Sequence, residues 1–96
     1  MKQPSFMENI GVTFLREGEQ FVAYSPALDL STAGDSLAQA QSRFAEAAQL
    51  FFEECFKTGT LSEVLTDLGW SSIKGRLTPP VVVAQDYQKI VVPLAA

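Results

Sequence analysis

The side chains that could carry chemistry in this 96-residue chain are eleven carboxylates and one cysteine, and the sequence contains no histidine. Two-metal phosphodiester chemistry needs several carboxylates that converge on ions about 4 Å apart. The acids are instead dispersed: Glu8 and Glu17 lie at or beyond the ends of the first apolar segment. Asp29 and Asp35 fall near predicted turns. This spacing does not predict a carboxylate metal site.

Nucleophilic catalysis has no support in the residue types either. A cysteine or serine nucleophile needs a neighbouring base, most often histidine, to activate it. One cysteine without histidine also cannot build a tetrahedral zinc site. Cys55 falls on the apolar stripe of a predicted helix, so we interpret it as a core residue. We therefore expect no catalytic residues, no metal and no cofactor, and a protein that is not an enzyme.

The charge of the chain is distributed unevenly. Residues 1–56 carry three basic and eight acidic side chains, a net charge of −5, whereas residues 57–96 carry four basic and three acidic ones, a net charge of +1. An acidic surface repels phosphate backbones and attracts basic ones, so the balance favours a basic protein partner over nucleic acid. Ordinary solubility explains the same balance equally well.

The number of cysteines and the hydropathy of the chain indicate its cellular compartment. A single cysteine excludes a disulfide within the chain, which suits a reducing compartment. No apolar run approaches the ~18 residues that a membrane span requires. We expect a cytoplasmic protein that makes no membrane contact.

The elements that must position any site begin with a predicted β-hairpin. Ile10, Val12 and Phe14 alternate with period two, and a charged turn at 16–19 precedes a return strand. Pro26 lacks an N–H and interrupts the ladder before a short third strand. The predicted strands are 10–15, 20–24 and 28–33, the last with Leu28 and Leu30 pointing inward.

A long amphipathic helix is predicted from Ser36 to about Lys57. Ser36 and Gln39 form a capping box at its start. The apolar positions recur at spacings of three and four, first as alanines and later as phenylalanines, so one face should pack on the sheet. This face comprises Leu37, Ala40, Phe44, Ala47, Phe51 and Cys55, widened by Ala48, Phe52 and Phe56.

A second, shorter helix is predicted over 61–68. Gly59 suits the end of the long helix, and Thr60 with Glu63 predicts another capping box. Gly69 and Trp70 predict a Schellman stop, in which the tryptophan ring packs back on Leu65.

The remaining chain is predicted to form a loop over 71–80 and two β-branched strands at 81–84 and 90–92. The expected order is β-β-β-α-α-β-β, an α+β fold with an antiparallel sheet and one long helix packed across it. We expect a single domain over 1–96 with a C-terminal β segment at 81–94. The twelve residues after Ala84 are too few for a separate DNA-binding domain.

The ordered combination of motifs over 24–36, YSPALDLSTAGDS, resembles the HicB-type antitoxins. The shared features are a hairpin that ends in an aromatic, a Pro-x-Leu step, a short strand, and Gly-Asp-Ser opening a helix with an early alanine. In this chain they are Tyr24, Pro26, Leu28, Gly34, Asp35, Ser36 and Ala40. The likeness extends over roughly residues 9–70 and is of moderate specificity for short motifs. Gln39 stands where the family usually carries glutamate.

The resemblance implies a partial RNase H-like fold without nuclease residues. It also implies neutralisation of a small basic HicA-type toxin, an RNA-cleaving protein, by direct contact. We expect the contact surface around Tyr24, Pro26, Leu28 and Asp29, where the Asp29 carboxylate could pair with a basic side chain. In the alternative interpretation Tyr24 and Leu28 are core residues and Asp29 is a solvated turn residue.

Two other functions stay open at this point. One is a solitary HicB-like regulatory or small-ligand-binding module without a toxin partner, since fold does not determine function. The other is an unusual nuclease, against which the dispersed acids weigh. We also expect a homodimer or larger oligomer, because the apolar strands predicted at 81–84 and 90–92 need a cover.

Overall fold

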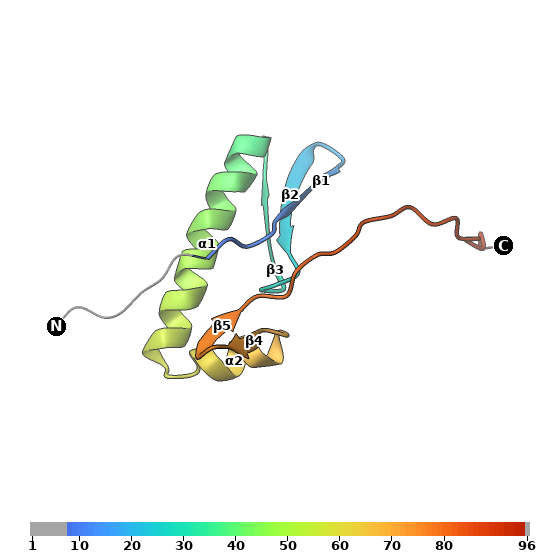
Figure 1. The fold of residues 1–96 in the computed structure, drawn as a ribbon. Coiled ribbons are helices and arrows are strands. Elements are labelled where there is room, and N and C mark those ends of the chain that lie inside the picture. Colours follow the sequence, from blue (N-terminus) through green and yellow to red (C-terminus); the bar gives the residue numbers. More distant parts are fainter. Residues whose placement is uncertain (1–7, 96) are drawn as a thin grey trace.

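The computed structural model of the chain describes residues 8–95, so residues 1–7 and 96 of the predicted 1–96 domain lie outside it. Its elements, in chain order, are β1 (Thr13–Glu17), β2 (Gln20–Ser25), β3 (Leu30–Gly34), α1 (Leu37–Lys57), α2 (Leu61–Asp67), β4 (Ser71–Ile73) and β5 (Arg76–Thr78). The first three strands form an antiparallel sheet in the order β1-β2-β3, and α1 lies across it (Figure 1). The α+β class is confirmed, whereas the RNase H-like detail stays a prediction.

The first strand lies further along the chain than predicted. Gly18 has a φ of 60° and is the first residue of a two-residue loop, a position that type II′ hairpin turns reserve for glycine. The ladder therefore continues to the pair Glu17–Gln20, and the predicted strand 10–15 with its turn at 16–19 is wrong at both ends. Ile10 and Val12 still pack against the core from the segment before β1.

The start of α1 follows the predicted capping chemistry. Ser36 Oγ accepts a hydrogen bond from the Gln39 backbone N–H at 3.1 Å, which satisfies one of the free donors of the first turn. The Gln39 side chain reaches back and accepts from the backbone N–H of Asp35 at 2.6 Å. The return bond thus ends one residue before the cap, and it still ties the β3–α1 connection to the helix.

Small side chains let the first half of α1 approach the sheet closely. Gly34, the last residue of β3, has no room for a Cβ, which would lie 2.7 Å from the backbone nitrogen of Ala40. Thr32 Oγ1 donates to the Ala40 carbonyl at 3.4 Å, and Arg43 Nη1 donates to the Ala33 carbonyl at 2.8 Å. The contact is therefore a backbone-to-backbone approach fastened by two side-chain hydrogen bonds.

The end of α2 confirms the predicted Schellman stop. The backbone N–H of Trp70 donates to the Leu65 carbonyl, and the backbone N–H of Gly69 donates to the Thr66 carbonyl, both at 3.0 Å. Gly69 has a φ of 96°. Both Trp70 and Leu65 belong to the buried core.

The predicted capping box at the start of α2 is wrong. Thr60 is the N-cap but makes no side-chain capping bond, because its hydroxyl pairs with that of Thr58 at 2.8 Å. Glu63 is thus left as an acid in the first turn of the helix, where the helix dipole favours it.

The C-terminal prediction is corrected in two ways. The predicted loop over 71–80 contains the β4–β5 hairpin, whose turn residues Lys74 and Gly75 both have positive φ, as type I′ turns require. The predicted strands at 81–84 and 90–92, and with them the C-terminal β segment 81–94, are wrong, because residues 79–95 contain no helix or strand. A β-branched run forms a strand only beside a pairing partner, and within the described chain this one has none.

Residues 79–95, which we call the tail, project from the rest of the molecule as an extended segment (Figure 1). The molecule measures 61 Å along its longest axis but only 29 and 24 Å along the others. The core lies between α1, the sheet and α2, and its buried hydrophobic residues are Ala23, Ala27, Leu28, Ala40, Phe44, Leu65 and Trp70.

Replacement of Phe44 tests the core. Its side chain is only 6% exposed, and a buried Phe→Ala change costs about 3–5 kcal/mol. Since a domain of this size has on the order of 5 kcal/mol of stability, Phe44→Ala should be largely unfolded at physiological temperature. Leu50→Ala on the same helix is the control, because Leu50 is 60% exposed. Thermal unfolding followed by circular dichroism compares the two; equal melting temperatures would contradict this core assignment.

Replacement of Gly34 tests the close approach of α1 to β3. The added methyl of Gly34→Ala would clash with backbone atoms that no rotamer change can move, so we expect a loss of about 1–3 kcal/mol. Gly11→Ala is the matched control, since its Cβ would meet nothing within 4 Å. Urea unfolding measures both, and a Gly34→Ala protein as stable as the control would show that the helix shifts freely on the sheet.

Candidate functional site

The predicted contact surface is the turn 26–29, which joins β2 to β3. β2 ends at Ser25 because Pro26 has no N–H to continue the ladder. Within the turn, Pro26 and Asp29 are exposed, whereas Ala27 and Leu28 are buried. The two outer residues of the turn are therefore available to a partner, whereas the two middle residues belong to the core.

Tyr24 and Asp29 meet across this turn. Tyr24 Oη donates a hydrogen bond to Asp29 Oδ1 at 3.1 Å, and Asp29 has a left-handed φ of 48°, which aspartate tolerates better than most residues. This hydrogen bond, followed by partial burial and the negative charge of the carboxylate, raises the pKa of Tyr24 above its ordinary value of 10.0. The pair holds the turn in one conformation and leaves the carboxylate at the surface.

A long-range hydrogen bond holds the turn from beneath. Trp70 Nε1 donates to the Ala27 carbonyl at 2.8 Å, a buried contact between residues 43 apart in sequence. Burying this carbonyl without a partner would cost about 1–3 kcal/mol. The indole also meets the Phe52 ring edge to face, with centroids 6.2 Å apart. The turn, α1 and the end of α2 are thus joined through one side chain.

Of the four predicted contact residues, three lie at the surface together. Pro26 and Asp29 are exposed and Tyr24 is half-buried. Leu28 is only 3% exposed and belongs to the core, as the alternative interpretation held. A partner that docks on this turn therefore meets the ring, the proline and the carboxylate, but not the leucine.

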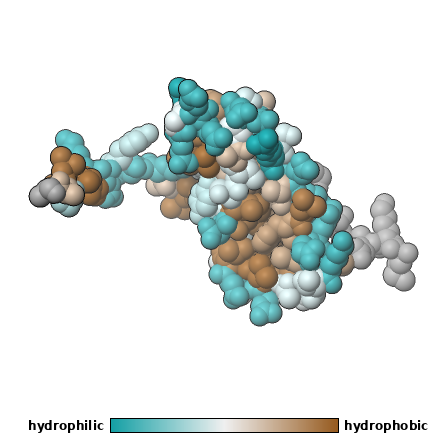
Figure 2. Space-filling view, turned by 180° about the vertical axis from the view of Figure 1, so that it is seen from behind, coloured by the Kyte–Doolittle hydropathy of each residue, from teal (hydrophilic) through white to brown (hydrophobic). Residues whose placement is uncertain are grey.

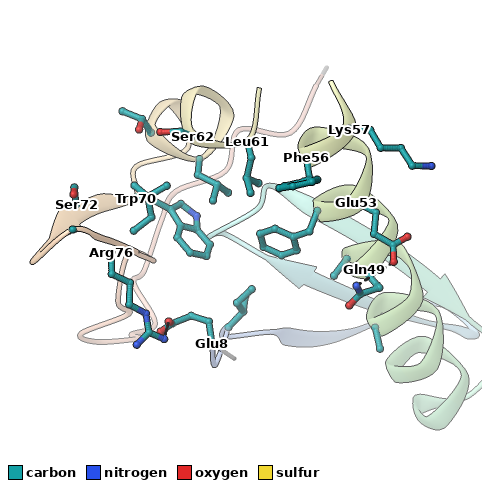
Figure 3. Close-up of a pocket in the computed structure, with 18 residues that line it drawn as sticks. Glu8, Gln49, Glu53, Phe56, Lys57, Leu61, Ser62, Trp70, Ser72 and Arg76 are labelled. Atoms are coloured by element: carbon teal, nitrogen blue, oxygen red, sulfur yellow. Dashed lines mark hydrogen bonds and ion pairs between the residues drawn. The ribbon is translucent and has the colours of Figure 1, made fainter. Parts of the chain in front are cut away.

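A second surface feature, an open apolar groove, was not predicted from the sequence. It runs between the Phe-rich half of α1, α2 and the β4–β5 hairpin (Figure 3), and Figure 2 shows it as an apolar hollow. Its apolar lining includes Ala48, Phe52, Phe56, Leu61, Leu65 and Trp70. The signal was the widening of the helix stripe by Ala48, Phe52 and Phe56, which gives more apolar width than one small sheet covers.

Charged side chains border this groove. Arg76 Nη2 and Glu8 Oε2 form an ion pair at 2.8 Å at one end, joining the hairpin to the segment before β1 (Figure 3). Glu53 and Lys57 stand on the α1 side. The volume of the groove, about 1660 Å³, exceeds the roughly 300–1,000 Å³ of typical small-molecule sites, so it has the size to receive a polypeptide segment.

The residues that could hold a metal or act as nucleophiles stay apart. Over residues 8–95 no group of three or more acidic, cysteine or histidine side chains is placed to hold an ion. Cys55 is a half-buried free thiol on α1. Neither helix in this part of the chain has the length and hydropathy to cross a bilayer.

Comparison with protein-family models found no match, and comparisons with curated proteins and with solved structures found none either.

The Tyr24–Asp29 pair predicts a shifted tyrosine titration. The chain has two tyrosines, so Tyr87→Phe leaves Tyr24 as the sole one. Its pKa, followed by ultraviolet absorbance, should lie above that of free tyrosine and fall when Asp29→Asn removes the charged acceptor. Because the folded state holds this proton more tightly, the contribution to stability is present below the ordinary pKa near 10.0 and is lost as the pH rises through the folded-state pKa.

Asp86→Asn is the control for this titration, because Asp86 lies in the tail and its carboxylate accepts a hydrogen bond from the backbone N–H of the next residue. An unshifted Tyr24, or equal effects of the two asparagine variants, would contradict the pairing.

Proposed function

We propose that this protein is an antitoxin of the HicB type, which binds and neutralises a small basic RNA-cleaving toxin by direct contact. The observation that carries the proposal is the segment 24–36, whose motifs resemble that family. In this chain the segment forms a surface turn, a strand and a capped helix start in unbroken succession. Under this proposal the pair acts in the cytoplasm.

The rigidity of the turn supports a role in binding. The Tyr24–Asp29 hydrogen bond fixes its outer side and the Trp70–Ala27 hydrogen bond fixes its inner side. A surface that is already ordered loses little conformational entropy when a partner docks, so more of the contact energy remains as affinity.

The charge of the same region supports a basic partner. The exposed Asp29 carboxylate can accept charge-assisted hydrogen bonds from lysine or arginine. Glu17 and Glu19 lie at the β1–β2 turn, at the opposite end of the same sheet, and add to the net charge of −5 of residues 1–56. Charge of this sign speeds the encounter with a cationic protein and slows the encounter with nucleic acid.

The proposal assigns the chain no catalytic step. The sequence offers no histidine to act as a base near neutral pH, and its carboxylates are spread over the sheet, the turns and the outer faces of the helices. RNA cleavage belongs to the partner in this scheme, and neutralisation follows from occupying the toxin's surface.

The second candidate is a solitary regulatory module that binds a ligand without a toxin partner. The apolar groove is the observation in its favour, since ligand sites are mostly apolar concavities. The size and openness of the groove favour a polypeptide occupant, which ranks this candidate below a protein-binding role.

Co-expression tests the antitoxin proposal. Each small basic reading frame next to this gene is expressed with and without the protein. We expect one frame to arrest growth, this protein to restore it, and the two to co-purify. If the frame is toxic and the protein neither rescues growth nor co-purifies with it, the proposal fails for that pair. RNA cleavage by the purified protein, abolished by changing one of its own acids, would overturn the non-enzymatic assignment.

A matched pair of variants tests the surface. Asp29→Asn removes one charge but keeps a residue that tolerates positive φ, and it should weaken toxin binding roughly 10-fold or more. Glu54→Gln removes one charge from an exposed position on α1 and should change the dissociation constant little. Equal effects of the two variants would mean that the turn makes no specific contact. Isothermal titration calorimetry measures both.

A further inference from the structure

The tail concentrates apolar surface that nothing in the described chain covers. Of the fourteen large hydrophobic side chains that are exposed, eight lie in the tail. Val83 is 94% exposed, Tyr87 is fully exposed and Val91 is 93% exposed. Most of these side chains fall in two runs, 81–83 and 90–94, and exposed apolar clusters mark interaction sites.

The groove between α1, α2 and the hairpin is an apolar concave surface that is not filled by the described chain. Phe56, on the α1 side, is 52% exposed, and Phe52 and Trp70 also line the groove. Its lining is mostly apolar, which suits the two apolar runs of the tail, 81–83 and 90–94. One molecule therefore carries both an uncovered apolar segment and an unfilled apolar groove.

The connection between the two keeps the tail out of its own groove. Pro79 and Pro80 have their φ angles held by their rings, and a following proline also confines Thr78 and Pro79 to extended conformations. The chain thus leaves β5 in a stiff, extended direction. In Figure 1 this direction leads away from α1, and the back view in Figure 2 shows the tail apart from the apolar hollow.

We infer that the tail of one copy of this chain lies in the groove of a second copy, and that the second tail fills the first groove in return. A reciprocal exchange about a two-fold axis closes on itself, so both tails and both grooves are covered without leaving a free end for further assembly. The inference rests on the tail and the groove, whereas the toxin-binding proposal rests on the turn 26–29. Only the base of the tail adjoins that turn, where Val81 and Val82 line a smaller pocket with Pro26 and Ala27.

The exchanged surface has the size of a stable interface. Successive side chains of an extended segment point to opposite sides, so about half of the eight face the groove, roughly 400 Å² at on the order of 100 Å² each. Because each copy also has its own groove covered by the other tail, each copy buries roughly 800 Å², the standard size of specific protein interfaces. An extended segment loses conformational entropy when it docks along a groove. The stiff Pro79–Pro80 step reduces that loss, because part of the segment is already restricted before docking.

Light scattering on the full chain is the first measurement. At tens of micromolar we expect twice the monomer mass of 10.5 kDa. Val83→Asp places a charge on the tail where the side chain is almost fully exposed in the single chain, so the fold is preserved while the dimer dissociation constant rises roughly 100-fold or more. A monomeric wild type or a dimeric Val83→Asp would overturn the exchange.

The groove is tested separately with two variants on α1. Phe56→Asp alters the groove and should also give a monomer, whereas Leu50→Asp, at an equally exposed position outside the groove, should leave the dimer intact. A dimeric Phe56→Asp would show that the tails pair with each other or with another surface and would overturn the inference. A monomeric Leu50→Asp would do the same, because charge anywhere on α1 would then suffice. Circular dichroism checks that each variant is folded.

Mixing the two kinds of variant gives a sharper result. Val83→Asp has an intact groove and Phe56→Asp has an intact tail, so a mixture restores one of the two contacts. We expect the mixture to associate at concentrations at which each variant alone is a monomer, with a tag on one variant recovering the other. A mixture that stays monomeric at every concentration up to that at which wild type is fully dimeric would contradict the reciprocal exchange.

Discussion

The hydrogen bond from the Trp70 indole to the Ala27 carbonyl is the interaction on which both surfaces of this protein depend. On one side it satisfies the backbone of the turn that carries Pro26 and Asp29. On the other side the same ring lines the apolar groove and meets Phe52. The Schellman stop that ends α2 places the indole there, because Gly69 turns the chain back through a left-handed conformation. A single helix end thus determines the geometry of two separate sites.

The size of the side chains along α1 determines the rest of the architecture. Near its start the helix touches β3 through Gly34 and Ala40, where even one methyl group does not fit. Further along, Phe51 and Phe52 are partly buried against the core and pack edge to face on one another. The groove lies beside this second half of the helix, between it, α2 and the hairpin.

Local signals in the sequence predicted both helices, and Ser36 with Gln39 and Gly69 with Trp70 act as expected. The capping box at Thr60 failed because the neighbouring Thr58 hydroxyl pairs with the threonine side chain. The other errors arose where a distant or more specific interaction decides the outcome. A two-residue turn at Gly18 shifted β1, and the runs at 81–84 and 90–92 have β-branched residues but no neighbouring strand. The Lys74–Gly75 step is itself a local hairpin signal, because glycine suits the second position of a type I′ turn.

The candidate site was predictable only in part, for a related reason. That Tyr24 and Asp29 belong to one surface follows from their closeness along the chain, whereas the burial of Leu28 depends on Trp70, which is far away in sequence. For the groove the sequence signals only surplus apolar width on α1 and does not indicate which segments border it. The groove brings together Glu8, the second half of α1 and the hairpin at Arg76, and no local pattern records that these segments meet.

The order β1-β2-β3 in space is also the order of these strands along the chain, and α1 follows them at once and packs back on β3. Every loop that must close to build this half of the molecule is short, so little chain entropy is lost before contacts form. Topologies of this kind reach the native state quickly, within the range of small mixed α/β domains. The sheet, with the turn 26–29 between β2 and β3, and α1 can therefore assemble before the long-range Trp70–Ala27 contact closes, so we expect the groove to be the last part of the structure to form.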